Sequence, residues 1–174
     1  DLAMAMIAER SIDEKLTLIV EKSRQILGTD TSFIALHDEK TDELRWHTSS
    51  GLVTERFKRL RVRMGKGLAG KVAQSGKWIV VEDYFKEIGS DVQGITREEG
   101  LISGITVPIQ IGQTNYGVLF AFNRTKTQFS KTDLDTLLLF GNFAAVEIAR
   151  KRSQERLQES EERYRKLYEE SKRR

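Results

Sequence analysis

The hydrophobic pattern along the chain changes its period several times, and each change predicts a new element. From Ser11 to Leu27 apolar residues recur every three or four positions, which predicts an amphipathic helix that Ser11 caps and Gly28 ends. Apolar segments between turn signals then predict strands at 31–37, 44–49, 61–64, 78–82, 103–111 and 116–123. The glycine-rich segment 65–70 starts a short helix that Gly76 breaks, and 83–100 is expected to be a loop with short helical turns.

The last 45 residues, 130–174, contain no proline and one glycine, and they predict a single long helix that Ser130 caps. Steps of four and three residues follow an apolar seam, which Arg150, Ser153 and Ser160 interrupt. We expect this seam to be a dimer interface formed by Leu139, Phe143, Val146, Leu157, Tyr164 and Leu167. At about 1.5 Å per residue the helix would be roughly 65 Å long, far longer than the preceding domain requires. It is therefore expected to lead to another module and to relay a signal.

The order of these elements predicts an α+β fold. It fits a central antiparallel β-sheet with the terminal helices packed together on one face. The irregular segments 53–75 and 83–101 are then expected to cover the other face and to leave a pocket beneath them. Along the chain we expect the end of an upstream connector helix (1–10), a globular domain (11–150) and a coiled-coil-like connector helix (151–174).

Composition limits the classes of function. The chain has no cysteine, which excludes disulfides, thiolate metal sites, a cysteine nucleophile and a thioether-bound chromophore. No apolar run approaches the ~20 residues of a membrane span and nothing resembles a signal peptide, so we expect a cytoplasmic protein. Residues 150–174 hold 10 of the 29 basic and 6 of the 26 acidic side chains, a net +4, which leaves 19 basic and 20 acidic ones, a net −1, elsewhere. The basic excess therefore belongs to a solvated helix and does not indicate nucleic acid binding.

Residues 65–72, Gly-Lys-Gly-Leu-Ala-Gly-Lys-Val, satisfy two phosphate-binding patterns at once. As G-x-x-x-x-G-K they resemble a P-loop, but Val72 replaces the Ser or Thr whose hydroxyl would reach magnesium. As G-x-G-x-x-G they resemble a dinucleotide fingerprint, which requires a parallel sheet and an acidic residue about 20 positions later. Glu82 and Asp83 come sooner, and the later strands form a hairpin. We interpret the stretch as a glycine turn before a packed helix, and a phosphate-loop enzyme is the least favoured alternative.

The same stretch opens a longer ordered pattern. Residues 65–70 resemble the G-x-G-[LI]-[AG]-G segment of GAF domains, and residues 76–83 resemble the strand of this family that ends in aspartate. Residues 103–109 are similar to its s-x-l-x-V-P-I strand, 116–122 to its x-G-V-L strand, and Phe129 with Asp133 to the start of its last helix. The resemblance covers residues 11–150 and implies the GAF fold. It also implies a sensor of small molecules or protein contacts that is usually dimeric and has no catalysis of its own.

Residues 159–169, Glu-Ser-Glu-Glu-Arg-Tyr-Arg-Lys-Leu-Tyr-Glu, resemble the lead-in to a PAS domain. In signalling proteins GAF and PAS modules are joined by such helices ahead of a histidine kinase or cyclase output. We therefore expect a regulatory sensing and dimerisation module of a signal-transduction protein, as in two-component systems, with its output module in the same chain. The alternative is a GAF domain without ligand that serves only as a dimerisation and transmission spacer.

Strand alternation predicts the lining of the ligand pocket. If Ile34 and Leu36 face the terminal helices, Phe33, Ala35 and His37 face the pocket. We expect walls from Phe33, Ala35, Trp46, Leu68, Ala69, Trp78, Tyr84, Phe85 and Phe120, with Asp83, Arg97, Ser103 and Thr106 as orienting polar groups. Such a lining offers few partners to a purine, which disfavours a cyclic nucleotide. The ligand or cofactor is not identified by the sequence, and a covalent bilin is excluded because it needs cysteine.

Three further groups of residues are given structural interpretations. Asn123, Arg124, Phe129 and Asp133 fit part of the cyclic-nucleotide pattern of GAF domains, but Leu134 replaces its glutamate. His37 and His47 lack accompanying carboxylates in a metal-binding pattern, so no metal site is expected. The basic residues are interpreted as a solvated strand edge and not as an anion or nucleic acid site: Arg56, Lys58, Arg59, Arg61, Arg63 and Lys66.

Overall fold

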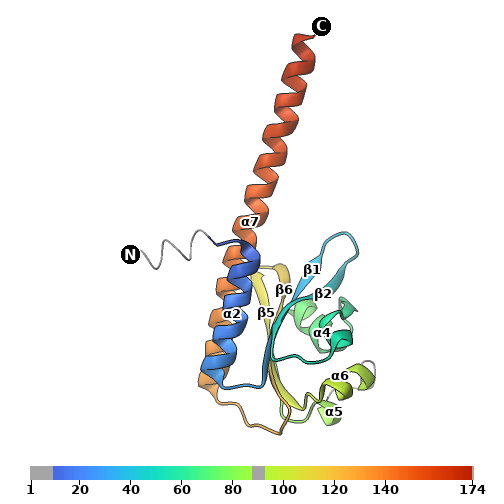
Figure 1. Cartoon of the computed structure of the whole chain (residues 1–174), viewed down its shortest axis with the longest axis vertical. Helices are drawn as coiled ribbons and strands as arrows, with labels where there is room; N and C mark the ends of the chain where they lie inside the picture. Colours follow the sequence, from blue (N-terminus) through green and yellow to red (C-terminus); the bar gives the residue numbers. More distant parts are fainter. Residues whose placement is uncertain (1–9, 88–92, 174) are drawn as a thin grey trace.

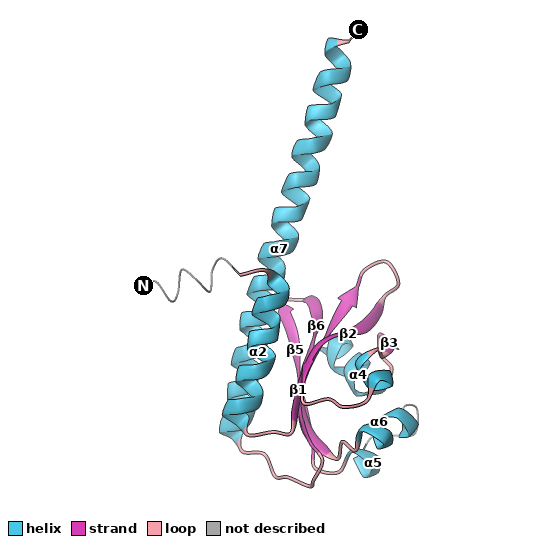
Figure 2. Cartoon of the chain, in the orientation of Figure 1, coloured by secondary structure: helices cyan, strands magenta, loops and turns pink. Residues whose placement is uncertain are grey.

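Helices α2 (Ile12–Leu27) and α7 (Lys131–Lys172) lie side by side on one face of a β-sheet (Figures 1 and 2). The computed structural model describes residues 10–87 and 93–173. The predicted connector helix at 1–10 therefore lies outside the described residues, apart from Arg10.

The ends of both helices follow the predicted capping signals. Ser11 Oγ accepts a hydrogen bond from Glu14 N at 3.2 Å, and Gly28 ends α2 with a φ of 68°. At the start of α7, Ser130 Oγ accepts from Asp133 N at 3.1 Å while Asp133 Oδ2 accepts from Ser130 N at 2.9 Å. These reciprocal bonds satisfy backbone donors that a helix start leaves without partners.

The sheet has the strand order β3-β2-β1-β6-β5-β4, and its hydrogen-bonded neighbours are antiparallel. The strands are β1 (Thr31–Asp38), β2 (Glu43–Ser50), β3 (Arg61–Arg63), β4 (Ile79–Val81), β5 (Ser103–Ile111) and β6 (Thr114–Asn123). The predicted α+β fold with a central antiparallel sheet is confirmed. The last hairpin is tighter than predicted, because Gly112 adopts a φ of 58° and lets Ile111 pair with Thr114.

A continuous apolar layer closes the helix side of the sheet. Helix α2 contributes Leu16 and Val20, and α7 contributes Leu137 and Ile148, all buried. Their partners on the sheet are Ile34, Ile105, Val107, Ile109, Leu119 and Ala121. Because each fully buried aliphatic side chain contributes about 1.5–3 kcal/mol, this layer makes the two helices and the sheet one unit.

Short elements cover the opposite face of the sheet. They are α3 (Glu55–Lys58), α4 (Gly67–Ser75), α5 (Tyr84–Glu87) and α6 (Gln93–Glu99). Figure 1 shows α4, α5 and α6 on the side of the sheet away from α2 and α7. The described parts of segment 83–100 thus contain short helices, as the sequence predicted.

Helix α7 continues far beyond the sheet, as Figure 1 shows. The side chains of its predicted seam are exposed: Leu139, Phe143, Val146, Leu157, Tyr164 and Leu167. From Ser153 to Arg173 every residue of the chain is exposed. Within residues 10–87 and 93–173, no helix combines the length and the apolar character that crossing a membrane requires.

Two leucines of α7, two positions apart, distinguish the helix face that packs inside the domain from the exposed seam. Leu137 is 0% exposed and Leu139 is 55% exposed. We expect Leu137→Ala to lower the free energy of unfolding by about 2–5 kcal/mol, because it leaves a cavity in the helix-side layer. Leu139→Ala should change it by less than about 0.5 kcal/mol at concentrations where the chain is monomeric. Urea unfolding measures both, and equal losses would contradict this assignment of faces.

Candidate functional site

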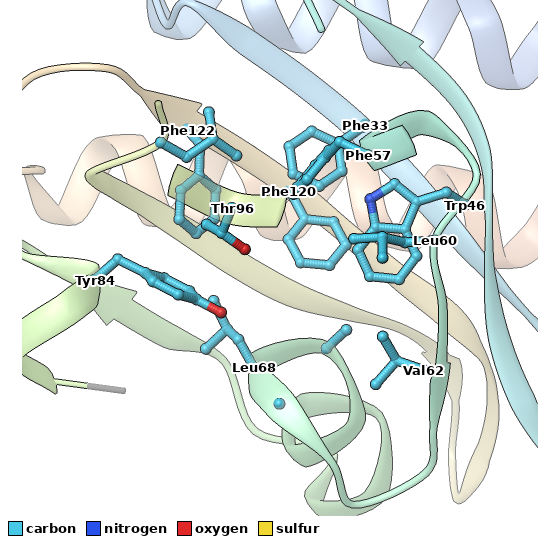
Figure 3. Close-up of a pocket in the computed structure, with 13 residues that line it drawn as sticks. Phe33, Trp46, Phe57, Leu60, Val62, Leu68, Tyr84, Thr96, Phe120 and Phe122 are labelled. Carbon is cyan, nitrogen blue, oxygen red and sulfur yellow. The ribbon is translucent and has the colours of Figure 1, made fainter. Parts of the chain in front are cut away.

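A small cavity lies between the sheet and the short helices (Figure 3). Its volume is about 40 Å³, which leaves room for a few water molecules, whereas ligand sites usually occupy about 300–1,000 Å³. Its lining consists of Phe33, Trp46, Phe57, Leu60, Val62, Gly67, Leu68, Ala69, Tyr84, Thr96, Leu101, Phe120 and Phe122. None of these described residues carries a charge.

Stacked aromatic rings from the central strands form the floor of the cavity. The rings of Phe33 and Phe120 are 4.3 Å apart between centroids and inclined by 14°. These two residues are directly opposed in the β1–β6 pairing, so their side chains leave the sheet on the same face. Trp46 of β2 continues the cluster, with its ring 5.5 Å from that of Phe120. Each such pair contributes about 0.5–1.5 kcal/mol beyond area burial, so the floor is ordered without a ligand.

A glycine on the neighbouring strand makes room for the last ring of the floor. Gly104 is opposed to Phe122 in the β5–β6 pairing. A Cβ at position 104 would lie 2.3 Å from the Phe122 ring, a distance that no real side chain tolerates. Phe122 therefore folds over Gly104 and reaches both the cavity and the ring of Tyr84, 6.3 Å away between centroids.

Three polar groups interrupt the apolar lining. In Figure 3 the hydroxyl groups of Tyr84 and Thr96 point toward the interior of the cavity. Burial raises the pKa of the Tyr84 phenol, and a hydrogen bond with the Thr96 side chain opposes this rise. The third group, Trp46 Nε1, is buried without a hydrogen-bond partner among the described residues. A buried donor without a partner costs about 1–3 kcal/mol, so an acceptor that reached this N–H group would be favoured.

The short helices and segments that cover the cavity are called its lid. Helix α6, which belongs to the lid, is anchored to the sheet by a buried carboxylate at its last residue, Glu99. Its Oε1 accepts from Val53 N at 2.6 Å and its Oε2 from Thr54 N at 3.0 Å. Arg124 at the end of β6 contacts Glu99 Oε1 at 3.2 Å and the Glu99 carbonyl oxygen at 3.0 Å, and it also donates to Gly51 O. One carboxylate thus ties the lid, the segment after β2 and the end of β6 together.

This arrangement, an antiparallel six-stranded sheet with paired terminal helices behind it and a cavity under short helices in front, can now be compared with known proteins. The family model described as GAF domain matches residues 9–149. The chain belongs to the GAF domain family. GAF domains commonly serve as small-molecule-sensing regulatory modules in signalling proteins.

Solved structures share this fold at low sequence identity. A GAF domain of a phosphoenolpyruvate-protein phosphotransferase from Coxiella burnetii has a TM-score of 0.75 and 19% identity over 87% of this chain and 90% of that one. A domain from Sinorhizobium meliloti, described as part of a two-component sensor histidine kinase, gives 0.74 and 17% over 86% and 99%. A free methionine-R-sulfoxide reductase from Neisseria meningitidis, solved with its substrate, gives 0.71 and 22% over 86% of each chain. No curated protein gives a significant match.

The GAF cavity brings together six of the thirteen pocket residues expected from the sequence. Phe33, Trp46, Leu68, Ala69, Tyr84 and Phe120 line it. Ala35 and Thr106 are buried on the same side of the sheet but do not reach the cavity, and Thr106 Oγ1 has no partner among the described residues. Ala35 is too short, and Thr106 lies on β5, farther from the cavity than its neighbour Phe120.

The other expected pocket residues lie elsewhere on the domain. Trp78 is 48% exposed beside the edge strand β4. Asp83 contacts Lys126 Nζ at 3.5 Å, and Ser103 Oγ donates to Thr125 O at 2.6 Å. The Arg97 guanidinium lies outside, 4.4 Å above the ring of Phe85. These side chains make contacts around the edge of the lid and do not line the cavity.

Sequence reasoning missed seven further residues that line the cavity: Phe57, Leu60, Val62, Gly67, Thr96, Leu101 and Phe122. Phe122 could have been found, because it alternates with Phe120 along β6. Phe57 and Leu60 belong to a segment without a clear period, so no local signal places them. Their position depends on how α3 packs on β2, where Leu60 O accepts from Trp46 N at 3.0 Å.

The residues of the partial cyclic-nucleotide pattern have structural contacts in this GAF domain. Asn123 Oδ1 accepts from Asp30 N at 2.7 Å, and Arg124 binds Glu99. Phe129 packs against the helix-side layer, and Asp133 is part of the cap of α7. Each of these four positions therefore has a role in the fold that requires no nucleotide.

The histidines and the glycine-rich stretch are likewise engaged within the fold. His37 Nε2 lies 2.7 Å from Asp42 Oδ1, not in the cavity, and His47 Nε2 lies 2.7 Å from Asp13 Oδ1. Among the described residues no group of three or more potential metal ligands is found. In the glycine-rich stretch, Gly65 N donates to Gly70 O at 2.9 Å, so this amide is not free to bind phosphate. The sheet is antiparallel, whereas the dinucleotide fingerprint requires a parallel one.

The adjacent residues Glu98 and Glu99 test the anchor of the lid. Glu99→Ala leaves two backbone N–H groups without their acceptor and removes the carboxylate partner of Arg124, so we expect it to cost about 3–5 kcal/mol of unfolding free energy. Glu98 is half exposed and only contacts Arg56 at 3.8 Å, so Glu98→Ala should cost less than about 0.5 kcal/mol. Denaturant unfolding gives both values. A loss below about 1 kcal/mol for Glu99→Ala would show that the lid is held by other contacts.

Proposed function

We propose that this GAF domain is a regulatory module that senses a small molecule, dimerises through α7 and relays the state of its cavity along that helix. The observation that carries the proposal is the aromatic cavity, which shares its floor strands with the packing surface of the terminal helices. Phe33 and Phe120 line the cavity, while Ile34 and Leu119, their neighbours in sequence, pack on the helix side. A displacement of these strands therefore changes the packing on both faces of the sheet.

The lining supports an uncharged and mainly apolar ligand. Because the cavity holds only about 40 Å³, a ligand must displace wall side chains and replace the contacts that they lose. A charged ligand would lose its hydration without meeting an opposite charge among the described lining residues. Trp46 Nε1 supplies one hydrogen-bond donor, and so a single acceptor on the ligand would be rewarded.

One observation favours the alternative of a ligand-free spacer. The floor rings are already stacked on one another, and the cavity is far below the usual size of a ligand site. In this alternative the aromatic cluster is simply a second core. Binding experiments with small uncharged compounds separate the two functions.

A matched set of probes tests the ligand class. Acetophenone carries a carbonyl acceptor, ethylbenzene has a similar shape without an acceptor, and benzoate is charged. We expect acetophenone and ethylbenzene to bind at millimolar concentration or below and benzoate to bind at least about tenfold more weakly, since a desolvated carboxylate finds no partner. Amide chemical-shift titrations measure the affinities and locate the contacts.

Variants at the two tryptophans provide the control. Trp46→Phe keeps an aromatic wall and removes the donor, so acetophenone should bind about 2- to 10-fold more weakly and ethylbenzene should be unaffected. Trp78→Phe, at an exposed position outside the cavity, should change neither affinity. Absence of binding by all three probes supports the spacer, and preferential binding of benzoate contradicts an uncharged ligand.

The exposed seam of α7 supports a dimer with parallel helices. Its apolar side chains recur at heptad spacing over two stretches, Leu139–Val146 and Leu157–Leu167. In a parallel pair, the residue before Leu157 faces the residue after Ser160 of the other helix. These are Arg156 and Glu161, which carry opposite charges. An antiparallel pair would lose this match.

The proposal extends along the chain beyond the seam. Because residues 159–169 resemble a PAS lead-in, we place a PAS- or kinase-type output module after α7 in the same chain. The module itself is proposed to have no catalytic activity of its own, as its resemblance to sensor GAF domains implies. A cytoplasmic location fits this role.

Adjacent residues of α7 test the dimer. Leu157→Asp places a charge in the seam and should weaken dimerisation at least about 100-fold, because each copy loses a buried leucine worth about 1.5–3 kcal/mol. Gln158→Asp adds the same charge one position away, off the seam, and should have little effect. Sedimentation velocity measures the dissociation constants. A wild-type chain that remains monomeric at tens of micromolar would contradict the dimer.

A further inference from the structure

The β1–β2 hairpin touches α7 at the point where this helix leaves the domain. Arg152 Nη2 donates to the His37 carbonyl oxygen at 3.2 Å, and Arg152 Nη1 contacts Glu39 Oε1 at 3.4 Å. The same guanidinium lies 5.1 Å from the centroid of the Tyr116 ring on β6. We call these four residues, together with Arg156, whose Nη2 lies 3.9 Å from Glu39 Oε1, the clasp.

The clasp is the last contact between α7 and the domain among the described residues. The Arg152 side chain is 24% exposed, whereas every residue from 153 to 173 is classed as exposed. An ion pair at the surface is weak by itself, but Arg152 also binds a backbone carbonyl and covers an aromatic ring. The position and the angle of the free part of α7 therefore depend on where the hairpin tip lies.

The tip of the β1–β2 hairpin, residues 38–42, is held by hydrogen bonds within the turn. Asp42 N donates to Asp38 O at 2.9 Å, and Lys40 N donates to Asp38 Oδ1 at 2.9 Å. The His37 ring adds a contact of 2.7 Å to Asp42 Oδ1. Because these bonds close the turn on itself, the tip moves as one piece with the strands that carry it.

Those strands also form the floor of the cavity. Phe33 lies on β1 and Trp46 on β2, about 17 Å and about 10 Å along their strands from the turn at roughly 3.3 Å per residue. Tyr116 precedes Phe120 on β6. Each of the three strands that hold the clasp thus carries at least one ring of the cavity floor.

We propose that the clasp is the coupling element that transmits the state of the cavity to α7. This inference rests on the proposed sensing function and names its regulatory contact. Displacement of the floor rings by a ligand shifts the hairpin tip, and the tip carries Arg152 with it. Arg152 lies off the dimer seam, two positions after Arg150 on the seam, so its contacts with the hairpin and a second helix lie on different faces of α7. Arg156 flanks the seam and is the one member of the clasp that also faces the second helix. A shift at Arg152 therefore turns or tilts each helix of the pair without competing with dimerisation.

The first test needs no ligand. It uses the 174-residue chain with Trp78→Phe, so that Trp46 is the sole tryptophan and reports on the cavity floor. In this background Arg152→Ala should increase acrylamide quenching of Trp46 at least about twofold and speed amide exchange at 37–43 by a similar factor or more. Glu39→Gln should act in the same direction from the hairpin side. Lys151→Ala is the matched control, because the one ion pair of Lys151 among the described residues is with Glu155 of its own helix, at 4.0 Å.

The second test adds acetophenone as the cavity probe. Saturation should change amide exchange at 150–160 at least about twofold in the parent chain, and Arg152→Ala should abolish this change while leaving probe affinity within about twofold. If Arg152→Ala leaves both Trp46 quenching and the response of α7 unaltered, the clasp is not the coupling element, although the sensing function stands. If acetophenone does not bind, the sensing proposal loses its support, and the quenching experiment alone decides whether the clasp is coupled to the floor.

Discussion

The central strands β1 and β6 are apolar on both faces, so the sheet must be covered twice, and the two covers differ in kind. On one face Ile34 and Leu119 meet two long helices that bury a continuous layer. On the other face Phe33 and Phe120 meet four short helices joined by irregular segments. Short elements bury little area each, so the second cover is the part of the domain in which local opening costs least. A cavity is found on this side for that reason.

The weak cover is held by a few specific polar contacts instead of a broad apolar interface. Glu99 anchors α6 through two backbone amides and Arg124, and this anchor lies at the edge of the cavity and not inside it. The lid can thus be fixed at one end while its inner surface adapts to a ligand. The stacked floor, in contrast, belongs to the strands, and a change there reaches the hairpin and the helices. Because the polar anchor lies outside the cavity, the lining itself contains no charged side chain among the described residues.

Much of the fold followed from local signals. Capping by Ser11 and Ser130, the stop at Gly28 and the alternation of β1 and β6 are set by neighbours a few residues apart, and their predicted positions are confirmed. The same alternation correctly placed Phe33 and Phe120 on the cavity side. It failed for Trp78, which lies beside a three-residue edge strand where alternation no longer implies burial. Arg97 and Asp83 were expected at the pocket because they lie on the lid, but charged side chains on a thin lid reach solvent at low cost.

By itself the sequence determined which residues form the two long helices and the strands, which of their faces are apolar, and that α7 extends beyond its domain, because periodicity and caps are properties of short stretches. Only the tertiary structure decided that Phe57, Leu60 and Thr96 close the cavity, that Glu99 pairs with Arg124, and that Arg152 meets the hairpin. The Glu99–Arg124 pair spans 25 positions of the sequence, and the contact between Arg152 and His37 spans 115. The geometry of these contacts depends on how the long helices on one face and the short helices on the other pack against a twisted sheet. No local pattern in the sequence determines this packing.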